Sequence, residues 1–437
     1  MSGLLRSRSF ARIVLAAIAI VFLAAPPALA KLSDREWKEA EKEFRKALAS
    51  NDLQAIVASV KTIATDQSKR AVDMLLEIGA QLDNIKVYDS VKEALADMTE
   101  PEAVEHMIAS LGKKTEQKQW SIRCVLCDVL SSMQHPGITE AIAKRLNDNV
   151  PYVVSAAAKA LGKRRDKAGV RPLIEKLKDL ERQKDVTWID VRQALTAICG
   201  EDFESAADWS HFWDVKEKDF DPERDRGEKS EASTTVRDAP EFFAEPIISK
   251  RIMFVIDVSG SMREVDPKID GKGGGKRVER VKKELQEYVK SLKPDVKFNI
   301  LAFDDKIRAW KKAEQGIQPA TPENKADAIQ WVSTLKENGW THTDEALKEA
   351  FRNLQINTIV LLSDGAPMRG KPNDPQSGAP IPPEEIYELV RGLNRLRGVK
   401  IHTFCFKVFE GNPQMQPFLD FMNTLAKENG GKMVLIP

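Results

Sequence analysis

The chain has 437 residues, a length that accommodates two to three domains with well-formed cores. Its 67 basic and 66 acidic residues leave a formal net charge of +1. This balance lacks the strongly basic character of chains whose main task is to bind nucleic acid, so we expect no nucleic-acid partner.

Residues 1–30 have the three parts of a secretory signal peptide. Basic residues come first, an apolar core follows, and an A-x-A cleavage site ends the segment: Arg6, Arg8 and Arg12, then Ile13 to Ala25, then Ala28-Leu29-Ala30. A retained membrane anchor is the alternative, but the apolar run of 13 residues is shorter than the roughly 18–20 that a membrane span needs. We therefore predict cleavage after Ala30 and export to a bacterial periplasm or the cell exterior, with membrane association only if the segment is retained. Because the segment carries three arginines and no acid, its removal changes the net charge from +1 to −2.

Residues 31–214 follow a helical period. Ser33-Asp34-Arg35-Glu36 is a capping box, and the apolar residues after it fall on one helix face. Shifting the sequence by 31 residues places small and leucine-rich positions over one another: Cys127, Leu130, Ile142, Leu146 and Asp148 over Ala158, Leu161, Leu173, Leu177 and Asp179. The segments Ile122-Arg123, Tyr152–Gly162 and Val191–Gly200 resemble HEAT-type repeats. We predict a HEAT-like solenoid, with an irregular helical bundle as the alternative.

A stacked helical solenoid offers a concave face to protein partners, so the helical domain is a candidate for a second protein-binding surface. Aromatic residues gather near its end: Trp188, Trp209, Phe212 and Trp213. We interpret them as a cap over the core of the last repeat, and a binding site as the alternative.

The four cysteines are Cys124, Cys127, Cys199 and Cys405. No second Cys/His pair stands at the spacing that a zinc site requires. We expect the four cysteines to act as small, buried apolar residues. A redox pair of Cys124 and Cys127 is the alternative.

Residues 215–241 are dense in charges of both signs and have little to bury, which predicts a solvated linker. We place the second domain at residues 242–437. Its first segment, Phe242–Ile248, is expected to form an edge segment before the first strand.

Strand and helix patterns alternate from Arg251 onward, as in a parallel sheet. Predicted strands cover 252–258, 297–303, 306–310, 358–363, 400–406 and 432–436, and predicted helices cover 278–292, 322–336, 343–354, 383–397 and 414–429. Two insertions, Arg263–Lys276 and Met368–Pro382, are rich in glycine or proline and are predicted to be loops. A phosphate-binding loop in the first of them is rejected because its lysine is not followed by Ser or Thr.

The buried strand at Ile252–Val258 ends in a D-x-S-x-S pattern formed by Asp257, Ser259 and Ser261. Oxygen ligands of this kind suit a hard cation such as Mg²⁺, Mn²⁺ or Ca²⁺. The pattern resembles the metal-ion-dependent adhesion site (MIDAS) of von Willebrand factor A domains. That resemblance implies two further ligands, which match Thr341 in Gly339-Trp340-Thr341-His342-Thr343 and Asp364 before Gly365.

The resemblance implies a Rossmann-like, doubly wound α/β fold with the strands that end in Asp257 and Asp364 side by side. It also implies a divalent cation, most simply Mg²⁺, with an open position for an acidic side chain of a protein partner. We therefore predict an exported, adhesion-type protein-binding module that is not an enzyme. A structural scaffold of the cell envelope and a metal-dependent hydrolase are the alternatives. A phosphatase of the haloacid dehalogenase type would place a second aspartate where Ser259 stands.

Overall fold

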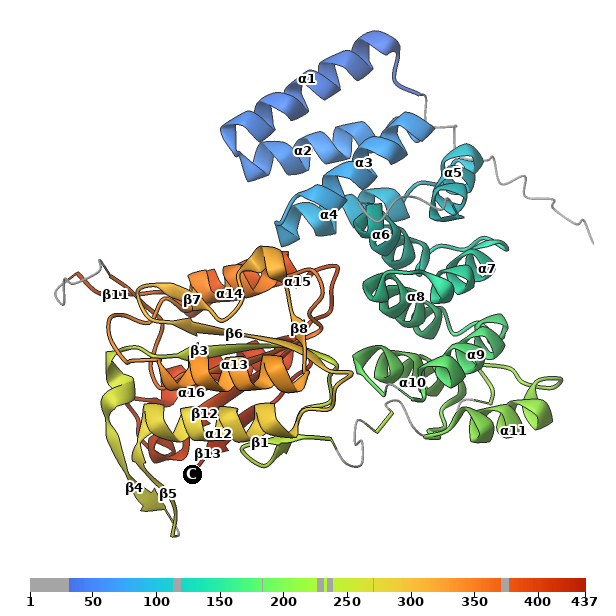
Figure 1. Ribbon diagram of the computed structural model, residues 1–437. Helices are drawn as coiled ribbons and strands as arrows, with labels where there is room; N and C mark the ends of the chain where they lie inside the picture. The colour runs from blue at the N-terminus through green and yellow to red at the C-terminus, as the bar shows by residue number, and fades with distance from the viewer. Residues whose placement is uncertain are drawn as a thin grey trace, which may run out of the picture.

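The computed structural model describes residues 31–112, 119–182, 184–225, 232–233, 239–269, 271–370 and 377–437. A helical domain is followed by an α/β domain (Figure 1). This confirms the predicted fold class. The predicted signal peptide lies outside the described residues.

The helical domain is a stack of short helices that pair into hairpins. Its helices are α1 (Asp34–Ser50), α2 (Leu53–Ala64), α3 (Lys69–Gln81), α4 (Ile85–Ala96), α5 (Pro101–Gly112), α6 (Trp120–Leu130), α7 (Ile138–Ala143), α8 (Pro151–Arg164), α9 (Val170–Leu180), α10 (Val186–Cys199) and α11 (Ala206–Lys216). The 31-residue shift found in the sequence matches the distance from the start of α6 to the start of α8. Trp188, Trp209 and Trp213 are fully buried in the core of this domain, as a cap over the last repeat requires.

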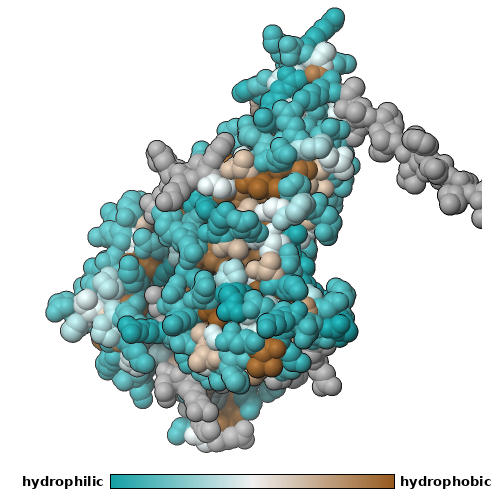
Figure 2. Space-filling view, turned by 90° about the vertical axis from the view of Figure 1, so that its right-hand side faces the viewer, coloured by the Kyte–Doolittle hydropathy of each residue, from teal (hydrophilic) through white to brown (hydrophobic). Residues whose placement is uncertain are grey.

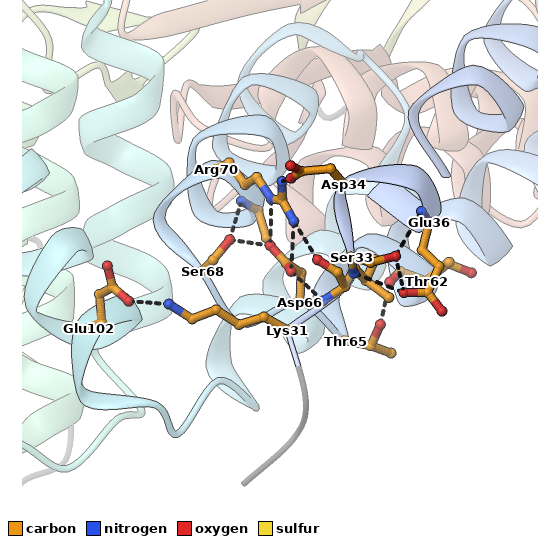
Figure 3. A network of polar contacts seen from close by, with 12 residues as sticks. Lys31, Ser33, Asp34, Glu36, Thr62, Thr65, Asp66, Ser68, Arg70 and Glu102 are labelled. Carbon is orange, nitrogen blue, oxygen red and sulfur yellow. Dashed lines mark hydrogen bonds and ion pairs between the residues drawn. The ribbon is translucent and has the colours of Figure 1, made fainter. Parts of the chain in front are cut away.

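The start of α1 is held by a polar network around Asp66, a carboxylate with no solvent exposure (Figure 3). Ser33 and Glu36 form the predicted capping box. Asp66 accepts a hydrogen bond from the Leu32 amide at 2.7 Å, and Arg70 pairs with Asp66 and donates to the Leu32 carbonyl at 2.7 Å. The network links the segment before α1 to the turn before α3.

The α/β domain is built on one sheet of seven strands. Its strand order is β13–β12–β9–β3–β6–β7, and β8 pairs with β6. The strands are β3 (Arg251–Asp257), β6 (Lys297–Phe303), β7 (Ile307–Ala309), β8 (Gln318–Pro319), β9 (Thr358–Leu362), β12 (Lys400–Phe406) and β13 (Met433–Ile436). β3, β6, β9, β12 and β13 run parallel, while β7 and β8 are antiparallel to β6. β3 and β9 are neighbours, as the resemblance implied.

Helices cover the sheet and bury the predicted apolar strands. They are α12 (Arg277–Ser291), α13 (Pro322–Ser333), α14 (Thr343–Arg352), α15 (Pro383–Asn394) and α16 (Gln416–Glu428). α13, α14 and α15 end two or three residues earlier than the sequence pattern predicts. Ile252, Phe254 and Val255 in β3 are fully buried, which explains why the strand has no polar residue between Arg251 and Asp257.

Three segments differ from the prediction. The expected edge segment at 242–248 instead forms its own small hairpin, β1 (Glu241–Phe242) with β2 (Glu245–Pro246), outside the main sheet. The first predicted loop is a hairpin, β4 (Val265–Ile269) with β5 (Lys272–Lys276). The second contains a shorter pair, β10 (Met368–Arg369) with β11 (Ala379–Pro380). Figure 1 shows β4, β5 and β11 on the side of the sheet away from the helical domain.

The helical domain contacts the amino ends of the sheet strands. Tyr152 at the start of α8 donates a hydrogen bond to the carbonyl of Ile356, just before β9, and accepts one of 2.8 Å from Arg397, just before β12. Arg395 donates to the carbonyl of Ala80 at 3.2 Å, and Arg251 lies 3.8 Å from Asp185. The carboxyl ends of the strands therefore point away from the helical domain.

All four cysteines are buried and carry free thiols, as expected for small apolar residues. Burial raises the pKa of the Cys124 thiol, and it raises that of Cys127 to about 12. Within the described ranges, no helix combines the length and the apolar character that crossing a membrane requires.

Candidate functional site

The candidate site begins where β3 ends. Asp257 is the last residue of the strand and has no solvent exposure, and the chain turns immediately after it. The Ser259 amide donates a hydrogen bond of 2.7 Å to Asp257 Oδ1, and the Oγ atoms of Ser259 and Ser261 lie 3.1 Å apart. A short helical turn at Gly260–Arg263, held by the buried side chain of Met262, fixes this arrangement.

Asp364 reaches the same place from the neighbouring strand β9. Its Oδ1 accepts a hydrogen bond of 2.6 Å from Ser261, so the loops after β3 and β9 are joined directly. Because β3 and β9 are adjacent and parallel, their two aspartates lie at the same edge of the sheet.

The loop that carries Thr341 closes the third side. The Gly260 amide donates a hydrogen bond of 3.1 Å to the carbonyl of Gly339, and the Met368 amide donates one of 2.9 Å to the carbonyl of Thr341. Gly339 has a φ of 71°, a conformation that favours glycine, and a Cβ there would lie 2.7 Å from the Asp305 carboxylate. The segment thus lies against the loops that follow both β3 and β9.

The two carboxylates sit in an environment that disfavours negative charge. Burial, together with the nearby Asp364, raises the pKa of Asp257 to about 7, while hydrogen bonds from Ser363 and Ser259 act in the opposite direction. Burial also raises the pKa of Asp364, although Ser261 and Arg277 lower it in part. Two buried acids held this close are stabilised by a cation between or beside them.

The donor set fits a hard divalent cation. Three hydroxyls and two carboxylates supply only oxygen, the ligand type that Mg²⁺, Mn²⁺ and Ca²⁺ prefer. In the described part of the chain no cluster of three or more His, Cys, Asp or Glu side chains could hold a metal ion, so a cation here would depend on the hydroxyls. Asp257, Ser259, Thr341 and Asp364 are buried whereas Ser261 is exposed, so the site opens to solvent on the side of Ser261.

Sequence reasoning missed two residues that contact the site. Ser363 donates a hydrogen bond of 2.6 Å to Asp257 Oδ2, and Arg277 lies 2.9 Å from Asp364 Oδ2. Ser363 directly precedes a predicted ligand, so its position offered a signal. Arg277 follows a glycine-rich insertion of unpredicted shape and offered none.

Trp340, beside the predicted ligand Thr341, packs against the second insertion. A Cβ at Gly370 would lie 2.4 Å from its Nε1, and a Cβ at Gly378 would lie 2.2 Å from its six-membered ring. The indole therefore lies against the glycines that flank β10 and β11. It supports the rim of the site from within the chain.

Comparison with known proteins adds two family matches. Residues 252–366 match the von Willebrand factor type A domain, and residues 153–179, which cover most of α8 and α9, match the PBS lyase HEAT-like repeat.

Curated relatives match only part of the chain. Mouse inter-alpha-trypsin inhibitor heavy chain 4 is 29% identical over 199 residues, which is 43% of this chain and 18% of the relative. Bovine inter-alpha-trypsin inhibitor heavy chain H3 is 29% identical over 165 residues, 34% of this chain and 16% of the relative. The chain thus spans less than a fifth of the length of these relatives.

Solved structures that match part of the chain include a von Willebrand factor type A protein from Catenulispora acidiphila, at 19% identity and a TM-score of 0.32, covering 44% of this chain and 39% of that one. The PilB minor pilin from Streptococcus sanguinis matches at 16% identity and a TM-score of 0.31, covering 44% of this chain and 58% of that one. On the family matches and the sheet topology, the C-terminal half of this chain is a von Willebrand factor A domain, and the helical half before it contains a HEAT-like repeat.

Proposed function

We propose that this chain is an exported protein-binding module that holds a divalent cation, most simply Mg²⁺, at Asp257, Ser259, Ser261, Thr341 and Asp364. The observation that carries the proposal is the junction of the two sheet loops, where Ser261 bonds to both Ser259 and Asp364 at a solvent-facing position. When bound, the cation supplies a Lewis-acidic position that an acidic side chain of a protein partner can complete.

The residues of the chain prepare this contact. Asp257 is fixed by Ser363 and the Ser259 amide, so its orientation does not depend on a ligand. The hydroxyls of Ser259, Ser261 and Thr341 are neutral donors and would leave positive character on a bound cation. Ser259 stands where a phosphoryl-transfer mechanism of the dehalogenase type would need an acid, which favours a binding role over that reaction.

A cell-envelope scaffold that binds through its helical domain is the second candidate. Figure 2 shows one face of the molecule, mostly hydrophilic, with separate hydrophobic patches over the helical half. Leu48 and Leu53, at the α1–α2 turn, are large apolar side chains that remain exposed. These features favour a further contact surface on the helical domain.

Calorimetric titration of Mg²⁺, Mn²⁺ and Ca²⁺ into the chain beginning at Lys31, with acetate present, tests the proposed metal site. We expect saturable binding that Asp257→Ala abolishes, because the buried carboxylate at the end of β3 is lost. Asp305→Asn is the matched control, since Asp305 lies on the same rim outside the ligand set, and it should retain saturable binding. Circular dichroism of both variants in EDTA establishes that they fold.

Absence of binding in the unmodified chain would refute the metal site and favour the scaffold. Equal binding by the unmodified chain and Asp257→Ala would place the cation elsewhere.

A further inference from the structure

Arg277 connects the candidate metal site to the β4–β5 hairpin. Its Nη1 lies 2.9 Å from Asp364 Oδ2, and its Nη2 lies 2.8 Å from Asp266 Oδ1 in β4. Arg280, one turn further along α12, contacts only the hairpin acid in this cluster, with Nη1 at 3.3 Å from Asp266 Oδ2. Arg277 is thus the arginine of this pair that touches a candidate ligand.

The guanidinium is enclosed and held in a single place. The Arg277 side chain is 11% exposed, against 5% for Asp266 and 0% for Asp364. Its central carbon also lies 5.5 Å and 4.9 Å from the ring centres of Phe406 and Phe409. A charge fixed at this depth is only weakly screened by solvent and salt, so it acts strongly on its neighbours.

Arg277 changes the charge that a cation at the site would meet. Asp364 uses Oδ1 to accept from Ser261 and Oδ2 to accept from Arg277, so one of its two oxygens already faces a positive group. If all five groups carry their full charge, the three carboxylates of Asp257, Asp266 and Asp364 and the guanidiniums of Arg277 and Arg280 sum to −1. A divalent cation would therefore make the cluster positive overall.

We propose that Arg277 tunes the site for an anionic partner: it weakens binding of the cation and strengthens the hold of the bound cation on a carboxylate ligand. This inference rests on the proposed metal site. It makes Arg277 a specificity-determining residue, because a centre with surplus positive charge selects a carboxylate over neutral oxygen ligands.

Replacing the charge should move two affinities in opposite directions. Arg277→Gln keeps an amide that can donate to Asp364 but removes the positive charge. We expect Mn²⁺ to bind about tenfold more tightly by calorimetry, because a nearby repulsive charge is gone. Acetate should bind the Mn²⁺-loaded variant about tenfold more weakly, as measured by the fall in water-proton relaxation when acetate displaces water.

Three variants separate charge from geometry. Arg277→Lys keeps the charge and should retain both affinities close to those of the unmodified chain. Arg280→Gln removes a charge that does not touch Asp364, so its effects should be smaller than those of Arg277→Gln. Asp266→Asn removes the acid that shares Arg277 and should weaken Mn²⁺ binding and strengthen acetate binding, the reverse of Arg277→Gln.

The results distinguish an effect of the Arg277 charge from an effect on the position of Asp364. A loss of both affinities in Arg277→Gln, or equal shifts in Arg277→Gln and Arg277→Lys, would show that Arg277 only positions Asp364 and would overturn the inference. If Arg277→Gln does not fold, the Asp266→Asn variant tests the inference instead. Unchanged or tighter Mn²⁺ binding by Asp266→Asn would contradict the charge argument. Failure of the unmodified chain to bind Mn²⁺ would instead refute the proposed metal site itself.

Discussion

Ser363 illustrates how the chain accommodates a buried acid at the end of a strand. Asp257 has no solvent exposure, and its two oxygens are bonded by different groups, the Ser259 amide and the Ser363 hydroxyl. Ionisation of a buried carboxylate is unfavourable without such donors. The serine therefore contributes to the site without belonging to the predicted ligand set.

Ser363→Ala should destabilise the metal-free protein by about 1–3 kcal/mol, because a buried carboxylate oxygen loses its donor. Urea unfolding in EDTA measures this change. Ser291→Ala is the control: Ser291 is exposed and bonds only within its own helix, to the Tyr288 carbonyl, so its cost should be small. Equal midpoints for the two variants would contradict the argument.

At the scale of elements, the sequence predicts the parts that depend on local pattern. The apolar runs of β3, β6, β9 and β12 predict buried strands, and the family resemblance of the D-x-S-x-S, G-x-T-x-T and D-G segments implies the candidate ligands. The β4–β5 hairpin is not predictable in this way, because its sequence is charged and glycine-rich. Asp266 at its base is instead held by Arg277 and Arg280 from α12, a contact that no local pattern reveals.

Strand β12 contains a partly buried titratable group, His402. Burial and the nearby Lys400 and Lys432 lower its pKa from 6.5 to about 4. The unfolded chain therefore takes up a proton at higher pH than the folded chain does. Stability should fall as the pH is lowered from about 6.5 toward 4, by up to about 3 kcal/mol from this residue.

His402→Gln should remove that part of the pH dependence. Chemical unfolding between pH 7 and pH 4 measures the difference between the variant and the unmodified chain, which should shift in favour of the variant as the pH falls. His211→Gln, on an exposed position of α11, serves as the control. A constant difference for His402→Gln across this range would refute the assignment.

At the scale of the whole molecule, the two domains meet through residues far apart in sequence. Tyr152 and Ile356 are separated by 204 positions, and Tyr152 and Arg397 by 245. Tyr152 and Arg397 are both buried, and the arginine also donates to the carbonyls of Phe351 and Asn353. Such a junction cannot be inferred from the periodicity of either domain. The sequence therefore predicts the order of the two domains but not the residues through which they contact each other.

Tyr152→Phe should loosen this junction by about 1–3 kcal/mol, because it leaves the Ile356 carbonyl and an Arg397 donor without their partner. Faster hydrogen–deuterium exchange at residues 392–399 would report the change. Lys86→Ala is the matched control across the same junction. It removes an exposed pair with Glu388 at 3.3 Å, worth about 0–1 kcal/mol, and should leave exchange nearly unchanged. Identical exchange in both variants would contradict a structural role for Tyr152.

The strand β3 begins beside the helical domain, where Arg251 faces Asp185, and ends at Asp257 in the candidate site. A partner that pulls on the site while the helical domain is held would therefore load β3 along its length. The hydrogen bonds from β3 to β6 and β9 run across the strand axis. When β3 is pulled along that axis, these bonds bear the load at the same time and do not open one after another. Force applied between the two ends of β3 would therefore act on this strand in shear.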